Sequence, residues 1–147
     1  LHLAAGPSFA TLAKADAPWP TAKAKSIGEH FGGYKLTPDE RPTFLYRIGD
    51  VSVTDTPAPV VVGKDFGLKR TIDLTATKNV SDLYYRAAVG SKIVDQGKGV
   101  YTIDGSLKMT ITSAQPPVIR AVAGKMELVV PVEFKDSKSR IVQEYTW

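Results

Sequence analysis

The chain has 147 residues, of which 43% are hydrophobic and 23% charged, and its formal net charge is +4. This composition is that of one folded domain and argues against a disordered chain. Because there is no cysteine, disulfides, thiolate zinc sites, iron–sulfur clusters, a cysteine nucleophile and covalently attached c-type haem are excluded within this chain. No apolar run approaches the roughly 18–20 residues of a membrane span, and the positive charges are too scattered to predict a nucleic-acid surface.

Residues 1–26 are rich in Ala, Lys and Pro and have no regular apolar period, so we expect an irregular N-terminal arm or linker. Ser8 could cap a short helix, but the same stretch could equally form a strand. Trp19 lies between two prolines, which favour an extended backbone. We expect this tryptophan to pack on a sheet face of this domain or of a partner. The chain begins at Leu1 rather than Met, and we expect it to be a processed or excised piece.

From Phe31 onward apolar and polar residues alternate almost everywhere, which is typical of β-strands. Residues 31–55 predict a β-meander in which a Gly-Asp pair at 49–50 forms a two-residue hairpin turn. Two more alternating stretches follow at 68–75 and 83–89. Each of these stretches has one apolar face that a core can bury.

The clearest hairpin joins "VYTI" to "SLKMTIT" through Asp104-Gly105. The strand after it contains Pro131, whose missing N–H predicts an edge strand or a proline on an unpaired side. We expect the inward-facing residues of these strands to share one core: Leu107, Met109, Ile111, Leu128, Val130 and Val132.

About ten short strands separated by turn signals, with no long amphipathic helix, predict an all-β fold. We expect an antiparallel β-sandwich over residues 27–147, preceded by the irregular arm of residues 1–26.

Candidate catalytic residues are few. His2 and His30 are far apart in the sequence, so we expect no metal site, and no serine has the context of a Ser–His–Asp triad. The "DQGKG" stretch at 95–99 lacks the spacing of a calcium loop and no helix follows it, so it predicts a hairpin turn.

The acidic residues give no evident catalytic pair. Asp39 and Glu40 are neighbours in a turn, whereas Glu127 and Glu133 lie on the outward face of one strand, too far apart to act together. A hydrolase would need two carboxyls about 5–10 Å apart across a cleft, which cross-strand pairing could supply. We assign no catalytic, metal or cofactor-binding residue and expect no cofactor.

The candidate interface or ligand contacts are four aromatic residues: Trp19, Tyr84, Tyr145 and Trp147. Tyr84 and Tyr85 are strand neighbours, so one should lie in the core and the other on the surface. Tyr145 and Trp147 share a face at the end of the chain. An exposed aromatic row could stack on sugar rings; the alternative is that these aromatics belong to the core and a capped edge.

Several stretches resemble a segment of large exported bacterial proteins of the planctomycete type: "APWP", "GGYKLTPDERPTFLYRIGDVSVTDTPAP", "LKRTIDL", "DLYYRAAVG", "YTIDGSLKMTI" and "RIVQEYTW". Those proteins combine quinoprotein-dehydrogenase-like β-propellers, c-type cytochrome domains and β-sandwich modules. The resemblance runs from about Trp19 onward and is most specific at "RPTFLYRIGDVSVTD". It implies a periplasmic or extracellular β-sandwich module and carries over no catalytic residue. Because this chain has no CxxCH, any haem of such a protein would lie elsewhere.

These observations favour a non-catalytic interaction or structural module of an exported redox protein or complex, associated with a cytochrome or quinoprotein. Its sheet face and arm would contact other domains or subunits. One alternative is a carbohydrate-binding module, which an exposed row of aromatics would favour. Another is a hydrolase, which two carboxyls facing each other in a concave pocket would favour. We expect that this chain alone is not an enzyme, with the hydrolase alternative left open.

Overall fold

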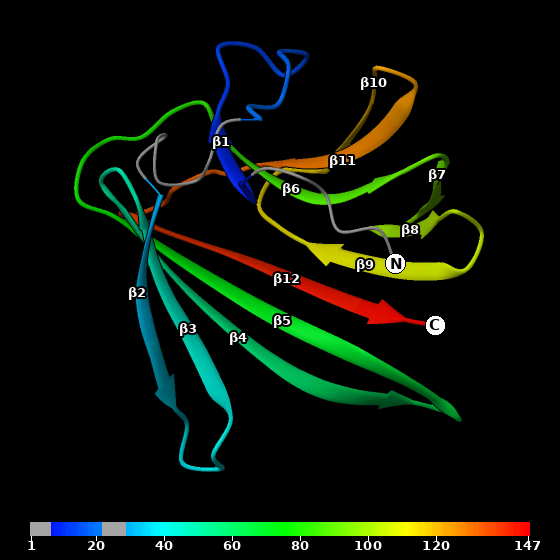
Figure 1. Cartoon of the computed structure of the whole chain (residues 1–147), viewed down its shortest axis with the longest axis horizontal. Helices are drawn as coiled ribbons and strands as arrows, with labels where there is room; N and C mark the ends of the chain where they lie inside the picture. The colour runs from blue at the N-terminus through cyan, green and yellow to red at the C-terminus, as the bar shows by residue number, and fades with distance from the viewer. Residues whose placement is uncertain (1–6, 22–28) are drawn as a thin grey trace.

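The computed structural model describes residues 7–21 and 29–147, and all regular structure in these ranges is β-strand (Figure 1). The predicted all-β sandwich is confirmed, although the described residues form twelve strands rather than about ten, and β4 and β5 have 12 residues each. A small sheet has the order β1 (Phe9–Thr11), β6 (Leu83–Gly90), β11 (Lys125–Pro131), β10 (Val118–Val122). A large sheet has the order β2 (Glu29–Leu36), β3 (Pro42–Ile48), β4 (Val51–Val62), β5 (Asp65–Ala76), β12 (Lys138–Thr146), β9 (Leu107–Thr112), β8 (Val100–Ile103), β7 (Ile93–Gly97). Every neighbouring pair in both sheets is antiparallel.

The predicted hairpin turns are present with one change of length. Ile48 pairs with Val51, so the turn at 49–50 has two residues, and Gly49 takes the positive φ of 55° that such a turn requires. The turn after β8 has three residues rather than two, because Ile103 pairs with Leu107 and leaves Ser106 in the turn.

Pro131 does not lie in an edge strand, because β11 is interior to the small sheet. It is the last residue of β11 and pairs with Tyr84 of β6 on one side only, since the register with β10 stops at Val129. Pro131 has no partner residue on β10, so its missing N–H costs the sheet no hydrogen bond on that side. This is the second predicted arrangement, a proline on an unpaired side of its strand.

One core lies between the two sheets and contains the predicted set. Met109, Ile111, Leu128, Val130 and Val132 are buried, and Leu107 is partly buried against them. This core is continuous from β9 on the large sheet to β11 on the small sheet, so the assignment of inward faces on these strands is confirmed.

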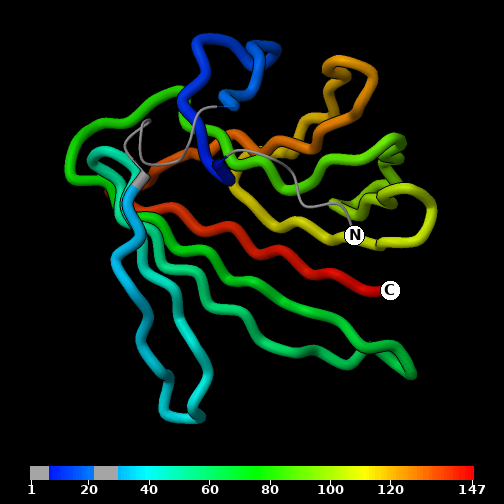
Figure 2. The backbone as a smooth tube through the Cα atoms, in the orientation of Figure 1, coloured from blue at the N-terminus to red at the C-terminus, as the bar shows by residue number. Residues whose placement is uncertain are grey.

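The large sheet is wider and longer than the small sheet. At one side it approaches the small sheet, where β7 contacts β11 and β8 contacts β6, and the Ile93 N–H lies 3.4 Å from Met126 Sδ. At the other side the β2–β3 and β4–β5 hairpins extend away from the small sheet, as the ribbon and the backbone trace both show (Figures 1 and 2). The sandwich is therefore closed on one side and open on the other.

The described part of the arm, residues 7–21, belongs to the fold. Phe9 pairs with Tyr85 in the β1–β6 ladder and is fully buried, and its ring centroid is 4.9 Å from that of Tyr85 and 6.3 Å from that of Tyr46. The predicted boundary between arm and sandwich at residues 26 and 27 lies outside the described residues. Within the described ranges no helix has the length and apolarity to cross a bilayer.

Candidate functional site

The structure separates the four candidate aromatics into two pairs on different surfaces. Trp19 and Tyr84 lie together on the outer face of the small sheet, where they pack with Val129. Tyr145 and Trp147 line a cleft between the two sheets. Tyr84 is half-buried beneath the arm while Tyr85 is buried in the core, so Tyr85 is the core member of that pair.

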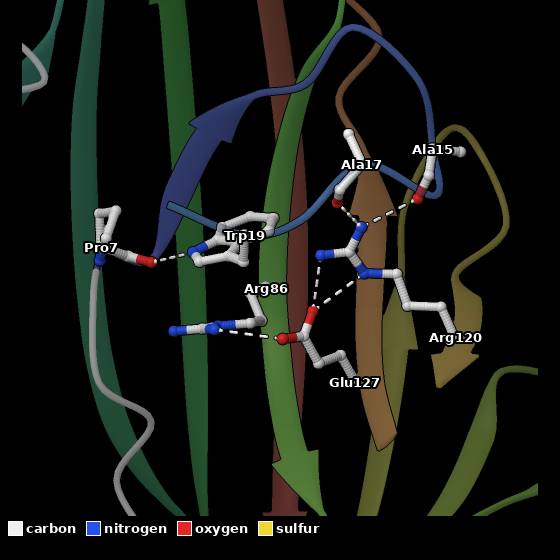
Figure 3. Close-up of polar contacts among 7 residues, drawn as sticks. All are labelled: Pro7, Ala15, Ala17, Trp19, Arg86, Arg120 and Glu127. Atoms are coloured by element: carbon white, nitrogen blue, oxygen red, sulfur yellow. Dashed lines mark hydrogen bonds and ion pairs between the residues drawn. The ribbon is translucent and has the colours of Figure 1, made fainter. Parts of the chain in front are cut away.

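Trp19 is held inside the chain rather than presented to a partner (Figure 3). It is only 5% exposed, and its indole Nε1–H donates to the carbonyl of Pro7 at 2.8 Å. The guanidinium groups of Arg86 and Arg120 lie 5.0 Å and 5.8 Å from the ring centroid, within the range of cation–π attraction. Its role is to fix the arm on the small sheet.

Glu127 completes this arrangement. It lies on the outward face of β11 as predicted, but the arm buries it, so it is not a surface carboxylate. Its Oε2 accepts from Nε of Arg120 at 2.9 Å and from Nη2 at 2.7 Å, and its Oε1 accepts from Arg86 at 3.4 Å. Burial lowers the pKa of Arg86, and the negative charge of Glu127 opposes that shift.

The same ion cluster fastens the arm backbone. Arg120 Nη1 donates to the carbonyls of Ala15 and Ala17, the first at 3.1 Å (Figure 3). Arg120 thus links Glu127 to the backbone of the arm.

The cleft between the two sheets has a volume of about 890 Å³. It lies between β6 on one side and β5, β12 and β9 on the other, and Trp147, 69% exposed, stands at its mouth. Its volume is in the range of roughly 300–1,000 Å³ that is usual for ligand pockets. Its apolar lining includes Leu68, Ala88, Val89, Leu107 and Met109.

Arg70 is the centre of a polar floor in this cleft. Its Nη2 donates to Asp55 Oδ2 at 2.5 Å and its Nε to Oδ1 at 3.4 Å. Its Nη1 donates to the hydroxyls of Tyr85 at 3.1 Å and Tyr145 at 3.3 Å. Strand pairing explains the arrangement, because Gln143 lies directly opposite Arg70, and Tyr145 is two residues further along the same face of β12.

The floor continues into the core as a chain of hydrogen bonds. The Tyr85 hydroxyl donates to Gln143 Oε1 at 2.6 Å, and Gln143 Nε2 donates to the carbonyl of Ala87 at 3.1 Å. The register shift between β6 and β11 leaves Ala87 without a partner residue on β11. Its carbonyl is therefore free to accept from Gln143. This buried network fixes the orientation of Arg70 from below.

Two pKa shifts follow from this packing. Burial raises the pKa of the Tyr85 hydroxyl well above its ordinary value, so Tyr85 stays neutral and donates. Burial opposes the charge on Arg70, but the oxygens of Tyr85 and Asp55 outweigh it and raise the pKa of Arg70. The cleft therefore holds a permanent cation paired with one carboxylate.

Two carboxylates lie at the cleft, Asp55 beneath its floor and Asp104 in its lining, and both have hydrogen-bond partners. Among the described residues that line the cleft, Asp104 is the only carboxylate, and it accepts the backbone N–H groups of Ser91 at 2.8 Å and Lys92 at 2.9 Å. Residues 7–21 and 29–147 contain no cluster of three or more His, Asp or Glu residues that could hold a metal.

Beside the cleft, the large sheet continues as an exposed apolar surface that we call the open face. Strand pairing places its residues on the inner side of the sheet: Phe31 opposite Tyr46, Tyr34 opposite Phe44, and Val61 opposite Phe66. Tyr46 itself packs on the core. The open face consists of Phe31, Tyr34, Leu36, Phe44, Val61 and Phe66, which are 37–69% exposed.

Sequence reasoning missed the polar floor, although a signal was present. Asp55 follows Val51 and Val53 in the same phase of one strand, and Arg70 stands between Leu68 and Ile72. A charged residue at an inward position of an apolar strand has to be paired, which marks it as part of a buried or half-buried site.

No protein-family model, curated protein or solved structure matches this chain. Similarity to known proteins therefore gives no information on the function of this chain. The function has to be inferred from the geometry of the cleft and the open face.

Proposed function

We propose that this chain is a non-catalytic interaction module that docks another polypeptide on its open face. The observation that supports this is the set of six large apolar side chains that one face of the large sheet leaves exposed. They form two groups on this face, one on β2 and β3 and one at the end of the β4–β5 hairpin. Large exposed apolar patches on soluble proteins mark interaction sites. Aromatic residues are also enriched in the buried centres of protein interfaces.

The backbone at this edge supports the same proposal. β2 is the last strand of the large sheet, so one side of it pairs with no strand among the described residues. Unpaired strand edges are templates for an added strand. An apolar segment of a partner would therefore gain backbone hydrogen bonds along β2 while its side chains cover Phe31 and Tyr34.

The host of this module is proposed from the sequence resemblance alone. We place it in a larger periplasmic or extracellular protein or complex of the cytochrome- or quinoprotein-associated, electron-transfer type. Its partners would then be other domains or subunits of that assembly, and the described arm would not take part because Trp19 is docked internally.

Photo-crosslinking in the native host tests the docking. Benzoylphenylalanine at Phe66 or Tyr34 should give one defined crosslinked polypeptide, because both side chains point into the partner. The matched control is Thr71, on the outer face of β5, which should give none. Equal crosslinking from Thr71 and Phe66, or none from the open face, would refute docking on this surface.

A carbohydrate-binding module is the second candidate, because the exposed side chains include the aromatic rings of Phe31, Tyr34 and Phe66. Sugar rings stack on aromatics but gain little from isolated aliphatic side chains. Leu36→Ser should therefore weaken protein docking and leave polysaccharide binding unchanged, whereas Tyr34→Ala should weaken both. Affinity electrophoresis in soluble polysaccharides and the crosslinking yield separate the two functions. The hydrolase alternative has no supporting observation among the described residues of the cleft.

A further inference from the structure

The inter-sheet cleft has a hydrogen-bonding character that the docking proposal does not use. Its lining is mostly apolar, with a polar floor around Arg70 and Tyr145 and further polar groups at Arg86, Asp104 and Ser106. A ligand that fills this cleft must therefore be apolar along most of its length and polar at one end.

The donors and acceptors of the floor determine what that polar end must be. The acceptors are already used: Asp55 and the Tyr85 oxygen accept from Arg70, and Gln143 Oε1 accepts from Tyr85. The hydroxyl proton of Tyr145 has no acceptor within residues 7–21 and 29–147, although its oxygen accepts from Arg70. A guanidinium has five N–H donors, and one on Arg70 Nη2 likewise has no partner in that part of the chain.

The floor therefore offers two free hydrogen-bond donors to a ligand, whereas each of its acceptors already has a donor. A polar end that accepts hydrogen bonds fits these two donors. An ammonium group at the floor would instead face the like charge of Arg70, and a sugar would bring hydroxyl protons that the floor does not need. Although Arg70 is paired with Asp55, its remaining N–H gives a carboxylate a charge-assisted hydrogen bond, which is stronger than one to a neutral oxygen. Two further charged groups line the cleft, Asp104 and Arg86. Asp104 Oδ1 accepts from two backbone N–H groups, and Arg86 donates to Glu127.

We propose that the cleft binds a single-chain carboxylate amphiphile, a fatty acid. Its carboxylate accepts from the Tyr145 hydroxyl and from Arg70, and its alkyl chain lies between Leu68 and Leu107 and extends past Trp147 toward the mouth. The site is separate from the open face and does not depend on the docking of a polypeptide there.

Calorimetric titration of the 147-residue chain tests the head group directly, with three probes that share one tail: dodecanoate, dodecanol and protonated dodecylamine, each below its micelle concentration. Dodecanoate should bind with a stoichiometry of one and at least about tenfold more tightly than dodecanol, because its head accepts charge-assisted hydrogen bonds. Dodecylamine should show no saturable binding. Equal affinities for the three heads, or no saturable binding of dodecanoate, would overturn the proposal.

Matched variants locate the ligand. Tyr145→Phe should weaken dodecanoate by roughly tenfold, since it removes one donor to a charged head, whereas Tyr34→Phe removes a hydroxyl from the open face and should change nothing. Leu107→Trp should abolish binding by filling the cleft, and Thr110→Trp places the same side chain on the opposite face of β9 as a control. Circular dichroism establishes that each variant is folded. Unchanged binding in both Tyr145→Phe and Leu107→Trp would contradict the assignment of the site.

The tryptophan at the mouth gives an independent readout. In a Trp19→Phe background the emission comes from Trp147 alone, and dodecanoate should shift it to shorter wavelength by covering the indole. Emission that stays unchanged at saturating dodecanoate would place the ligand elsewhere and refute the proposed pose.

Discussion

The two halves of the inner face of the large sheet have the same alternating pattern but different environments. On β5, Ile72 and Leu74 are 0% and 1% exposed, whereas Phe66, on the same face of the same strand, is 69% exposed. Ile72 and Leu74 belong to the core between the two sheets. The β2–β3 and β4–β5 hairpins, which carry the open face, extend away from the small sheet (Figure 1). An apolar face of a strand thus becomes either core or binding surface according to what lies over it.

The largest effect on stability is expected from removing the buried negative charge of Glu127. Glu127 is buried beneath the arm with two arginines, so Glu127→Gln leaves buried guanidinium charge without its counter-ion. We expect a loss of about 3–5 kcal/mol in the free energy of unfolding. The control is Asp73→Asn, which breaks the solvent-exposed pair with Arg140 and should have no measurable effect. Urea unfolding of both variants checks this, and equal losses would contradict the structural role of the cluster.

The next largest effect on stability is expected in the core, and a residue of the open face serves for comparison. Leu128 of the small sheet is fully buried, so Leu128→Ala should lower the free energy of unfolding by about 2–5 kcal/mol through loss of contacts and a residual cavity. Phe66→Ala, on the open face, should change it by less than about 0.5 kcal/mol. Denaturant unfolding measures both. A loss below about 1 kcal/mol for Leu128→Ala would show that the core face is wrong.

A smaller, pH-dependent effect is expected from Tyr85. Because its pKa is raised in the folded chain, the folded state keeps this proton above about pH 10 while the unfolded state releases it. The unfolded state then binds fewer protons, so stability is fully present below about pH 10 and falls as the pH rises further. The stability of Tyr85→Phe, measured by urea unfolding against pH, should fall less steeply in this range. Parallel curves for the two proteins would show that Tyr85 is not held neutral by burial.

The smallest effect on stability is expected at the backbone edge of the open face. Lys35 lies on β2, with its side chain exposed, and Lys35→Glu should leave the free energy of unfolding within about 0.5 kcal/mol of the parent. Its effect should instead appear in docking, because a charge change at an interface rim alters association rates. Association kinetics with the crosslinked partner, measured at two salt concentrations, check this; a change in unfolding alone would argue that β2 has a structural role only.

The sequence predicted the fold class, most hairpin turns and the shared core of Leu107, Met109 and Leu128, because a period of two and short turns are local properties. It did not predict which apolar faces are covered, since that depends on how far the small sheet reaches across the large one. It also gave no direct sign that Arg70, Tyr85 and Tyr145 meet, because strands distant in the chain bring them together. The burial of Glu127 likewise depends on the path of the arm, which no local pattern specifies.

The contrast between the covered and uncovered halves can be tested most directly by the reactivity of single cysteines, because the chain has none of its own. Phe66→Cys and Ile72→Cys place a thiol on the same face of β5, one in each half. The account predicts that Phe66→Cys reacts with a maleimide in the folded chain within roughly tenfold of its rate in the denatured chain. Ile72→Cys should react at least ~1,000-fold more slowly than when denatured, since it needs unfolding to become accessible. Comparable protection at both positions would mean that the open face is covered and would contradict the account.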